Sequence, residues 1–236
     1  MPPLENADHH GNRLLDLLPA ADRRRLLERM ELVELDLRQP VYESGKPIEH
    51  VYFPLTTVIS MLAVMEDGQA VEVATMGSEG MAGLPVFLGA STSPDLAFAQ
   101  IPGRALRMAA GEFRELANGA GTVQALLQRY TQAFFVQLAQ GAACNRLHSL
   151  DQRLARWLLM THDRVGRDRF PLTQEFMGRM LGVRRATVTQ AAGRLQQAGL
   201  ITYSRGIITI VDRPGLEAVS CECYRIITEE HHRLLG

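Results

Sequence analysis

The sequence has no apolar run of the roughly eighteen residues that a membrane-spanning helix needs. Its first segment, residues 1–13, lacks the basic start and apolar stretch of a secretory signal peptide. Cysteine is scarce, and Cys144, Cys221 and Cys223 are an odd number without the spacing of a disulfide framework. We therefore expect a cytoplasmic protein with reduced thiols and no membrane partner.

Motifs of catalysis are also absent. The chain contains no nucleophile elbow and no phosphate-binding loop, and it has no triad of metal ligands at catalytic spacing. Glu79 and Asp95 lack a plausible set of partners for acid–base chemistry. The sequence therefore predicts that the protein is not an enzyme.

Lysine is nearly missing, and the arginines that replace it are unevenly distributed. Residues 1–144 hold 11 basic and 17 acidic side chains, whereas residues 145–213 hold 12 basic and 5 acidic ones. The remaining tail, 214–236, is slightly acidic, with 2 basic and 4 acidic side chains. A single basic segment in an otherwise acidic chain is typical of a protein in which one part meets a polyanion.

The first half of the chain reads as short helices followed by short strands. Leucines at helical spacing within 12–30 predict helices there. Between 31 and 108, turn residues such as Asp67-Gly68 and Pro102-Gly103 separate runs rich in β-formers, a pattern typical of an antiparallel barrel or jelly roll. The predicted strands are Glu34–Leu37, His50–Phe53, Val58–Val64, Ala70–Ala74, Leu96–Ile101 and Ala105–Met108.

A long apolar helix is predicted between about Gly111 and Gly141. It is apolar around most of its circumference, so it must bury more than one face. One face can cover the barrel, and the other is predicted to pair with a second copy of the chain; a single helix wedged between two domains is the alternative. The residues assigned to dimerisation are Val123, Leu127, Tyr130, Phe134 and Gly141.

The most informative stretch predicts a helix-turn-helix. Thr173 can cap a first helix, and Gly182 stands where a tight turn requires a positive φ. A second helix follows over 184–197, and 199–211 reads as a small hairpin, or wing. The residues predicted to contact DNA are Thr173, Gln174, Arg184, Arg185, Ala186, Thr187, Thr189, Gln190, Arg194, Ser204 and Arg205.

The sequence of this region resembles that of the Crp/Fnr family of bacterial transcription regulators. The stretch LTQEFMGRMLGVRRATVTQAAGRLQQAGLI, which begins at Leu172, fits the family pattern closely, and residues 145–159 are similar to it as well. The resemblance implies an α+β fold with a cyclic-nucleotide-binding-like sensor domain (1–118), a dimerisation helix (119–147) and a winged helix-turn-helix domain (148–236). It also implies a homodimer that binds inverted-repeat DNA near promoters and contacts RNA polymerase.

The same resemblance places three base-reading positions on Arg185, Ala186 and Gln190. Arg185 matches the family's usual arginine, which can bind guanine with two hydrogen bonds. Ala186 stands in place of a glutamate, and Gln190 replaces a second arginine. The expected half-site therefore differs from that of the cyclic-AMP receptor.

The sensor domain departs further from its relatives. Aligned with the nucleotide-binding cassette, Leu84 falls on the glutamate that binds ribose and Asp95 on the arginine that neutralises phosphate. Neither can do so, which argues against cyclic AMP as a cofactor, although another cyclic nucleotide stays open, as does a regulator without any effector. The candidate effector pocket comprises Glu79, Gly80, Met81, Gly83, Leu84 and Asp95.

Other sensors of the family lack their ligands here. No cysteine precedes Cys144 to hold an N-terminal iron–sulfur cluster, and His50 is interpreted as a strand residue and not a haem ligand. Cys221 and Cys223, with His231 and His232, suggest zinc, but residues two apart on a helix diverge, so no metal site is predicted. A helix-turn-helix that docks a protein instead of DNA is the alternative function.

Overall fold

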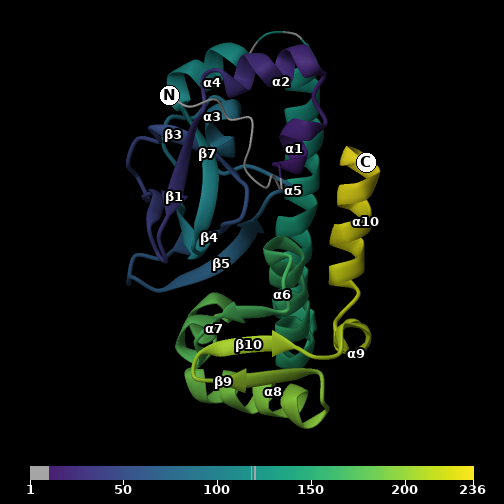
Figure 1. Ribbon diagram of the computed structural model, residues 1–236. Coiled ribbons are helices and arrows are strands. Elements are labelled where there is room, and N and C mark those ends of the chain that lie inside the picture. The colour runs from purple at the N-terminus through teal and green to yellow at the C-terminus, as the bar shows by residue number, and fades with distance from the viewer. Residues whose placement is uncertain (1–10, 118, 120) are drawn as a thin grey trace.

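A computed structural model describes residues 11–117, 119 and 121–236, and its N-terminal half consists of two antiparallel sheets. One sheet has the order β1-β7-β3 and the other β2-β6-β4-β5, and they face each other as a sandwich of the jelly-roll type (Figure 1). In the described residues the two sheets do not join into a closed barrel. The strands are β1 (Glu31–Leu35), β2 (Pro40–Tyr42), β3 (His50–Pro54), β4 (Val58–Val64), β5 (Ala70–Met76), β6 (Leu96–Ile101) and β7 (Gly103–Ala109).

Most of these strands lie where the spacing of the turn residues predicted them. The first strand begins at Glu31 instead of Glu34, and β2 was not predicted because its three residues are too few to show a periodicity. Four short helices complete the domain: α1 (Arg13–Asp16), α2 (Ala20–Leu27), α3 (Leu84–Phe87) and α4 (Ala110–Ala117). The α+β fold class is thus confirmed.

The long helix, α5 (Thr122–Leu147), connects the two halves of the molecule. The single helical stretch expected over 111–141 is two helices, since α4 ends at Ala117 and α5 begins at Thr122. One side of α5 packs on the sandwich, where the Tyr130 hydroxyl accepts from the Met81 amide (3.1 Å) and donates to the Met81 carbonyl (3.0 Å). Another side is covered by α10 (Cys223–Leu235), which runs alongside it (Figure 1).

The C-terminal half is a winged helical domain. It contains α6 (Leu150–Val165), α7 (Gln174–Leu181), α8 (Arg185–Gln197), α9 (Arg213–Val219) and a small sheet of order β8-β10-β9. The strands of that sheet are β8 (Arg169–Pro171), β9 (Ile201–Ser204) and β10 (Ile207–Ile210). The Ser149–Gln152 capping box at the start of α6 and the left-handed Gly166 after its end are both present.

The last helix does not belong to this domain by its contacts. It packs mainly on α5, and Leu235 is buried in the hydrophobic core of the N-terminal half. Helix α5 ends at Leu147 and α6 begins at Leu150, on either side of the expected limit at 148, and the limit at 118 lies outside the described residues. None of the described helices is both long and apolar enough to span a lipid bilayer.

The two halves also meet where α7 packs on β5 and α6 on β4. Trp157, the only tryptophan, donates from its indole nitrogen to Glu72 (2.5 Å), and the Ser60 hydroxyl donates to the other carboxylate oxygen (2.6 Å). Burial raises the pKa of Glu72 to about 7, although these two hydrogen bonds and the charges of Arg156 and Arg164 oppose the change. Glu72 therefore titrates at the contact between the halves close to neutral pH.

Glu72→Gln tests this contact. An acid whose pKa rises on folding stabilises the native state below its unfolded pKa, and that contribution is lost as the pH rises through the native value of about 7. We expect wild-type stability to fall by about 1–3 kcal/mol between pH 4.5 and 8 from this group, and the variant to lack that loss. The fluorescence of Trp157 should show a transition near pH 7 that Glu72→Gln abolishes; an unchanged transition in the variant would assign it to another group.

Candidate nucleic-acid interface

Helices α7 and α8 form the predicted helix-turn-helix. The Thr173 hydroxyl caps α7 by accepting from the Phe176 amide (3.2 Å), and Gly182 ends it in the left-handed conformation with φ of 65°. Gly178 allows the second helix to approach, because a Cβ there would lie 2.9 Å from the Val183 carbonyl oxygen. These three residues fix the start of α8 against α7.

Helix α8 presents a polar face to solvent. Val188, Ala191, Ala192 and Leu195 are buried and form its inner stripe, as predicted. Arg184 is the N-cap residue, so its side chain and that of Arg185 extend from the beginning of the helix. Exposed on the first two turns are Arg184, Arg185, Ala186, Thr187, Thr189 and Gln190.

Several predicted contact residues are partly committed to bonds within the chain. The Thr189 hydroxyl donates to the Gln174 side chain (2.8 Å), which connects the two helices across the exposed face. Arg194 binds both carboxylate oxygens of Asp151 on α6, at 2.6 Å each. The guanidinium of Arg194 is thus partly neutralised and holds α8 against α6, whereas Gln174 and Thr189 keep polar atoms at the surface.

The wing follows directly after α8. Arg205 and Gly206 both have positive φ, 50° and 77°, which is the geometry of a type I′ turn between β9 and β10. The Gln196 side chain accepts from the Tyr203 amide (2.8 Å) and so holds β9 beside the end of α8. Ser204 and Arg205 are exposed at the tip, as predicted.

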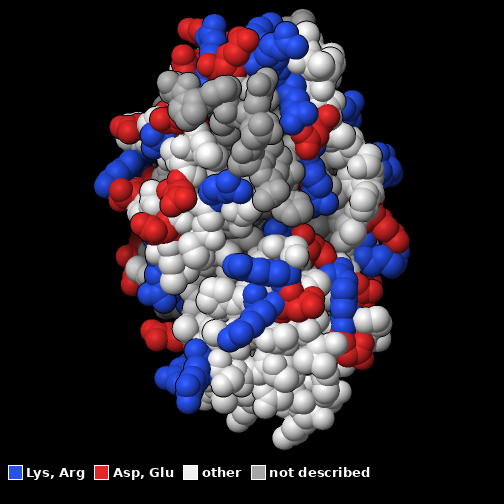
Figure 2. Space-filling view, in the orientation of Figure 1, with Lys and Arg blue, Asp and Glu red and all other residues white. Residues whose placement is uncertain are grey.

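Charged side chains are few at the lower end of this domain on its visible face (Figure 2). In Figure 2 the lower end of the molecule, made by α8 and the strands β9 and β10, is mostly white, and a group of Lys or Arg side chains lies at its left edge. Within the described part of the chain, no ion pair uses Arg179, Arg184, Arg185 or Arg205, and all four are exposed. Arg179, on α7, was not among the predicted contact residues.

The face of α5 predicted to pair two chains packs within the chain itself. Val123, Leu127, Tyr130 and Phe134 are at most 9% exposed because they pack on their own sandwich, and Gly141 lies beside the Val73 carbonyl. That assignment was wrong because helical spacing identifies an apolar stripe but not its neighbour. The next residue, Phe135, is 62% exposed.

The six residues of the candidate effector pocket have different surroundings. Met81 and Leu84 are buried in the core of the sandwich, and Gly80 lies tightly against the Tyr130 ring. Gly83 caps α3 with φ of 97°, and Asp95 accepts from the Ser93 hydroxyl (3.2 Å). Leu84 therefore fills the core of the sandwich.

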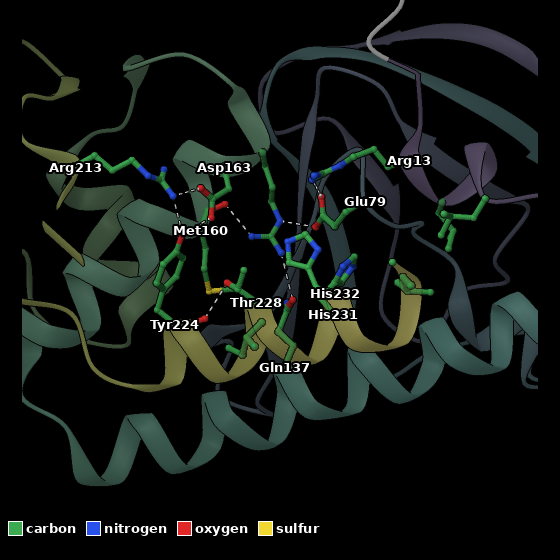
Figure 3. Close-up of a pocket in the computed structure, with 16 residues that line it drawn as sticks. Arg13, Glu79, Gln137, Met160, Asp163, Arg213, Tyr224, Thr228, His231 and His232 are labelled. Atoms are coloured by element: carbon green, nitrogen blue, oxygen red, sulfur yellow. Dashed lines mark hydrogen bonds and ion pairs between the residues drawn. The ribbon is translucent and has the colours of Figure 1, made fainter. Parts of the chain in front are cut away.

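Glu79 instead lies at a cavity between the two halves, of about 370 Å³ (Figure 3). Its buried carboxylate accepts from Arg164 of α6 at 2.7 Å, and Arg164 also reaches Gln137 of α5 at 3.3 Å. Burial alone would raise the pKa of Glu79, but the Arg164 charge, backbone hydrogen bonds and the nearby His231 together hold that pKa below its ordinary value. Sequence reasoning missed Arg164, whose partner is 85 residues away.

The cysteines are arranged differently from the expectation. Cys221 precedes α10 and only Cys223 lies on it, so their thiols need not diverge as they would within one helix. His231 and His232 do not join them. Cys144 and His148, at the end of α5, do.

Comparison with known proteins identifies the C-terminal half. Residues 152–219 match the family model of the Crp-like helix-turn-helix domain. FixK2 from Bradyrhizobium japonicum is similar over 81% of this chain and 98% of its own, with a TM-score of 0.70 at 18% identity. The c-di-GMP-responsive global regulator CLP of Xanthomonas campestris is similar over 81% and 99%, with a TM-score of 0.66 at 14% identity.

A third similar structure is a putative transcriptional regulator of the Crp/Fnr family from Eubacterium rectale, which covers 87% of this chain and 96% of its own. Its TM-score is 0.64 and its identity 18%. A search of curated proteins gives no match. The chain therefore contains a Crp-like helix-turn-helix domain within the fold of the Crp/Fnr regulators.

Two glycine substitutions test how α8 is positioned. Gly178→Ala should destabilise the domain by about 1–3 kcal/mol, because the new methyl group would press on the Val183 carbonyl. Gly193→Ala, in the middle of α8 with no atom within 4 Å of its added Cβ, should stabilise it by up to about 1 kcal/mol. Thermal unfolding midpoints that move in the same direction would contradict the tight approach at Gly178.

Proposed function

We propose that this chain, which has a Crp-like helix-turn-helix domain within a Crp/Fnr-type fold, is a transcription regulator that binds an inverted-repeat DNA site as a homodimer. It would act in the cytoplasm by contacting RNA polymerase near a promoter. The observation that carries the proposal is the exposed first half of α8, framed by the α7 cap and the wing.

The chemistry of that surface suits the major groove of DNA. Arg184 and Arg185 extend from the N-terminal end of α8, where a recognition helix meets phosphates and base edges. Arg185 can bind guanine O6 and N7, and Gln190, one turn further, can bind adenine N6 and N7. Because Ala186 offers no acceptor for cytosine N4, the half-site should differ from one read through a carboxylate at that position.

A dimer would use the face of α5 that both the sandwich and α10 leave uncovered. Gln128, Gln132, Phe135, Ala139 and Ala142 are exposed, and their 4-3-4-3 spacing is that of a coiled-coil seam. Phe135 is the large apolar side chain in the middle of this face. Pairing two α5 helices here would set the two copies of α8 for half-sites one helical turn apart.

We do not propose that cyclic AMP controls this protein through a binding site of the usual kind. Leu84 is buried in the core and Asp95 is bonded to Ser93, so neither is placed to bind ribose or phosphate. We infer that the protein responds to another ligand, such as a different cyclic nucleotide, or acts without one. The CLP protein, which has the same fold, is c-di-GMP-responsive.

Selection of sites from random DNA tests the function directly. The purified, ligand-free protein should enrich a two-fold symmetric motif, and its affinity should fall steeply with salt because phosphate contacts release counterions. A module that docks a protein instead would enrich no motif, and its weak DNA binding would not depend on sequence. Repeating the selection with cell extract would reveal a required effector.

Arg185→Ala tests base reading at the selected site. We expect a loss of about 1–3 kcal/mol in discrimination at one base position of each half-site, while other positions keep their preference. Arg225→Ala, which removes the same charge from the exposed surface of α10, should leave the motif unchanged. An equal loss of affinity for all DNA sequences would show that Arg185 contacts only phosphate.

Adjacent phenylalanines test the dimer. Phe135→Glu should produce folded monomers in sedimentation experiments, because it places a charge in the proposed seam. Phe134→Ala should instead lower stability by about 3–5 kcal/mol, because it empties a buried site. Leu88→Glu, at a residue of nearly equal exposure (59%) on the sandwich, is the control; dimers that survive Phe135→Glu would exclude this face of α5.

A further inference from the structure

Three thiols and one imidazole gather at the end of α5. Cys144 lies on its last turn, His148 is its C-cap residue, Cys221 precedes α10, and Cys223 begins it. The three cysteines are at most 3% exposed and form a cluster separate from the two hydrophobic cores. One potential ligand atom from each of the four residues lies within 4.8 Å of all the others.

The spacing of these atoms suits a single metal ion. A zinc–sulfur bond of about 2.3 Å places tetrahedral thiolates about 3.8 Å apart. Here the sulfurs of Cys144 and Cys221 are 3.4 Å apart, and the Cys223 sulfur is 3.7 Å from Nδ1 of His148. Small shifts would bring all four atoms to bonding distance around one centre.

The imidazole is oriented as metal-binding histidines usually are. Nδ1 of His148 faces Cys223, and Nε2 lies 3.1 Å from the Glu222 carboxylate. A proton on Nε2 donated to Glu222 leaves the Nδ1 lone pair directed at the thiols. A carboxylate bound to the far nitrogen is the common support of a histidine ligand, because it fixes both the tautomer and the ring.

Positive charge is available beside the cluster. Arg153 and Arg156 of α6 lie close enough to Cys144 to interact with it electrostatically. In the described residues the Nε atom of each is buried and has no hydrogen-bond partner. Three thiolates around a divalent ion carry a net charge of −1, which these guanidinium groups would offset.

A disulfide or an iron–sulfur cluster would account for fewer of these four side chains than a single metal ion does. A disulfide between Cys144 and Cys221 would leave Cys223, His148 and its carboxylate partner without a role. An iron–sulfur cluster binds its thiolates at separate iron atoms, so it needs ligands further apart than those of one ion. Three sulfurs and one nitrogen in a closed, buried set are the ligands of a structural zinc site.

We propose that Cys144, His148, Cys221 and Cys223 bind one Zn²⁺ per chain in a closed tetrahedral site. On binding, the thiols lose their protons to solvent and the imidazole stays neutral. Cys144 and His148 lie immediately before α6, so the ion would fasten the connection between α5 and α6 to the start of α10. It would thereby hold the direction of the winged domain relative to the dimerisation helix.

Metal analysis of the full-length protein, purified under reducing conditions, tests the site. We expect one zinc per chain by plasma mass spectrometry. After removal of the zinc, added Co²⁺ should produce the intense visible bands of tetrahedral cobalt together with a thiolate-to-cobalt charge-transfer band. Reduced protein that contains no zinc and gives no such spectrum with Co²⁺ would overturn the proposal, as would iron bound in place of zinc.

Single variants assign the ligands. Cys144→Ser, Cys221→Ser and Cys223→Ser should each weaken the charge-transfer band and lower zinc retention at least tenfold, and His148→Gln should lower retention while keeping the band. His232→Gln, an exposed histidine on the same helix as Cys223, should retain one zinc per chain. The wild-type cobalt spectrum decides the matter even where a variant does not fold, and a cysteine variant with an unchanged spectrum would remove that residue from the site.

Discussion

Helix α5 has more apolar surface than one neighbour can cover, and the rest of the molecule is arranged around that constraint. The sandwich takes the side that carries Tyr130 and Phe134, and α10 returns from the far end of the chain to cover a second side. A strip through Phe135 is left open. A second copy of the chain can pack on this strip without displacing the sandwich or α10.

The buried pair of Glu79 and Arg164 makes the contact between the halves specific. Burying either charge alone would be strongly unfavourable, so each half supplies what the other requires. Arg164 extends this link to α5 through Gln137, so sandwich, α5 and α6 share one polar network. The adjoining cavity is lined by all three residues of this network.

Local patterns predicted local structure well. The Ser149 capping box, the Gly182 turn and the inner stripe of α8 needed only neighbouring residues, and all are present. What each face packs against depends on contacts between distant residues, which explains the wrong dimerisation face on α5. The thiol cluster was not predicted for the same reason, since Cys144 and Cys221 are 77 residues apart. The prediction also placed Cys221 and Cys223 on one helix, where their side chains would diverge, whereas α10 begins only at Cys223.

The return of α10 has a consequence for biosynthesis. Leu235 lies in the same core as Leu14, so residues near both ends of the described chain pack into one hydrophobic cluster. On the ribosome, α10 emerges after every other described element. The sandwich and α5 therefore remain without this cover until α10 has been synthesised, and a nascent chain stalled before α10 would expose apolar surface to chaperones and proteases.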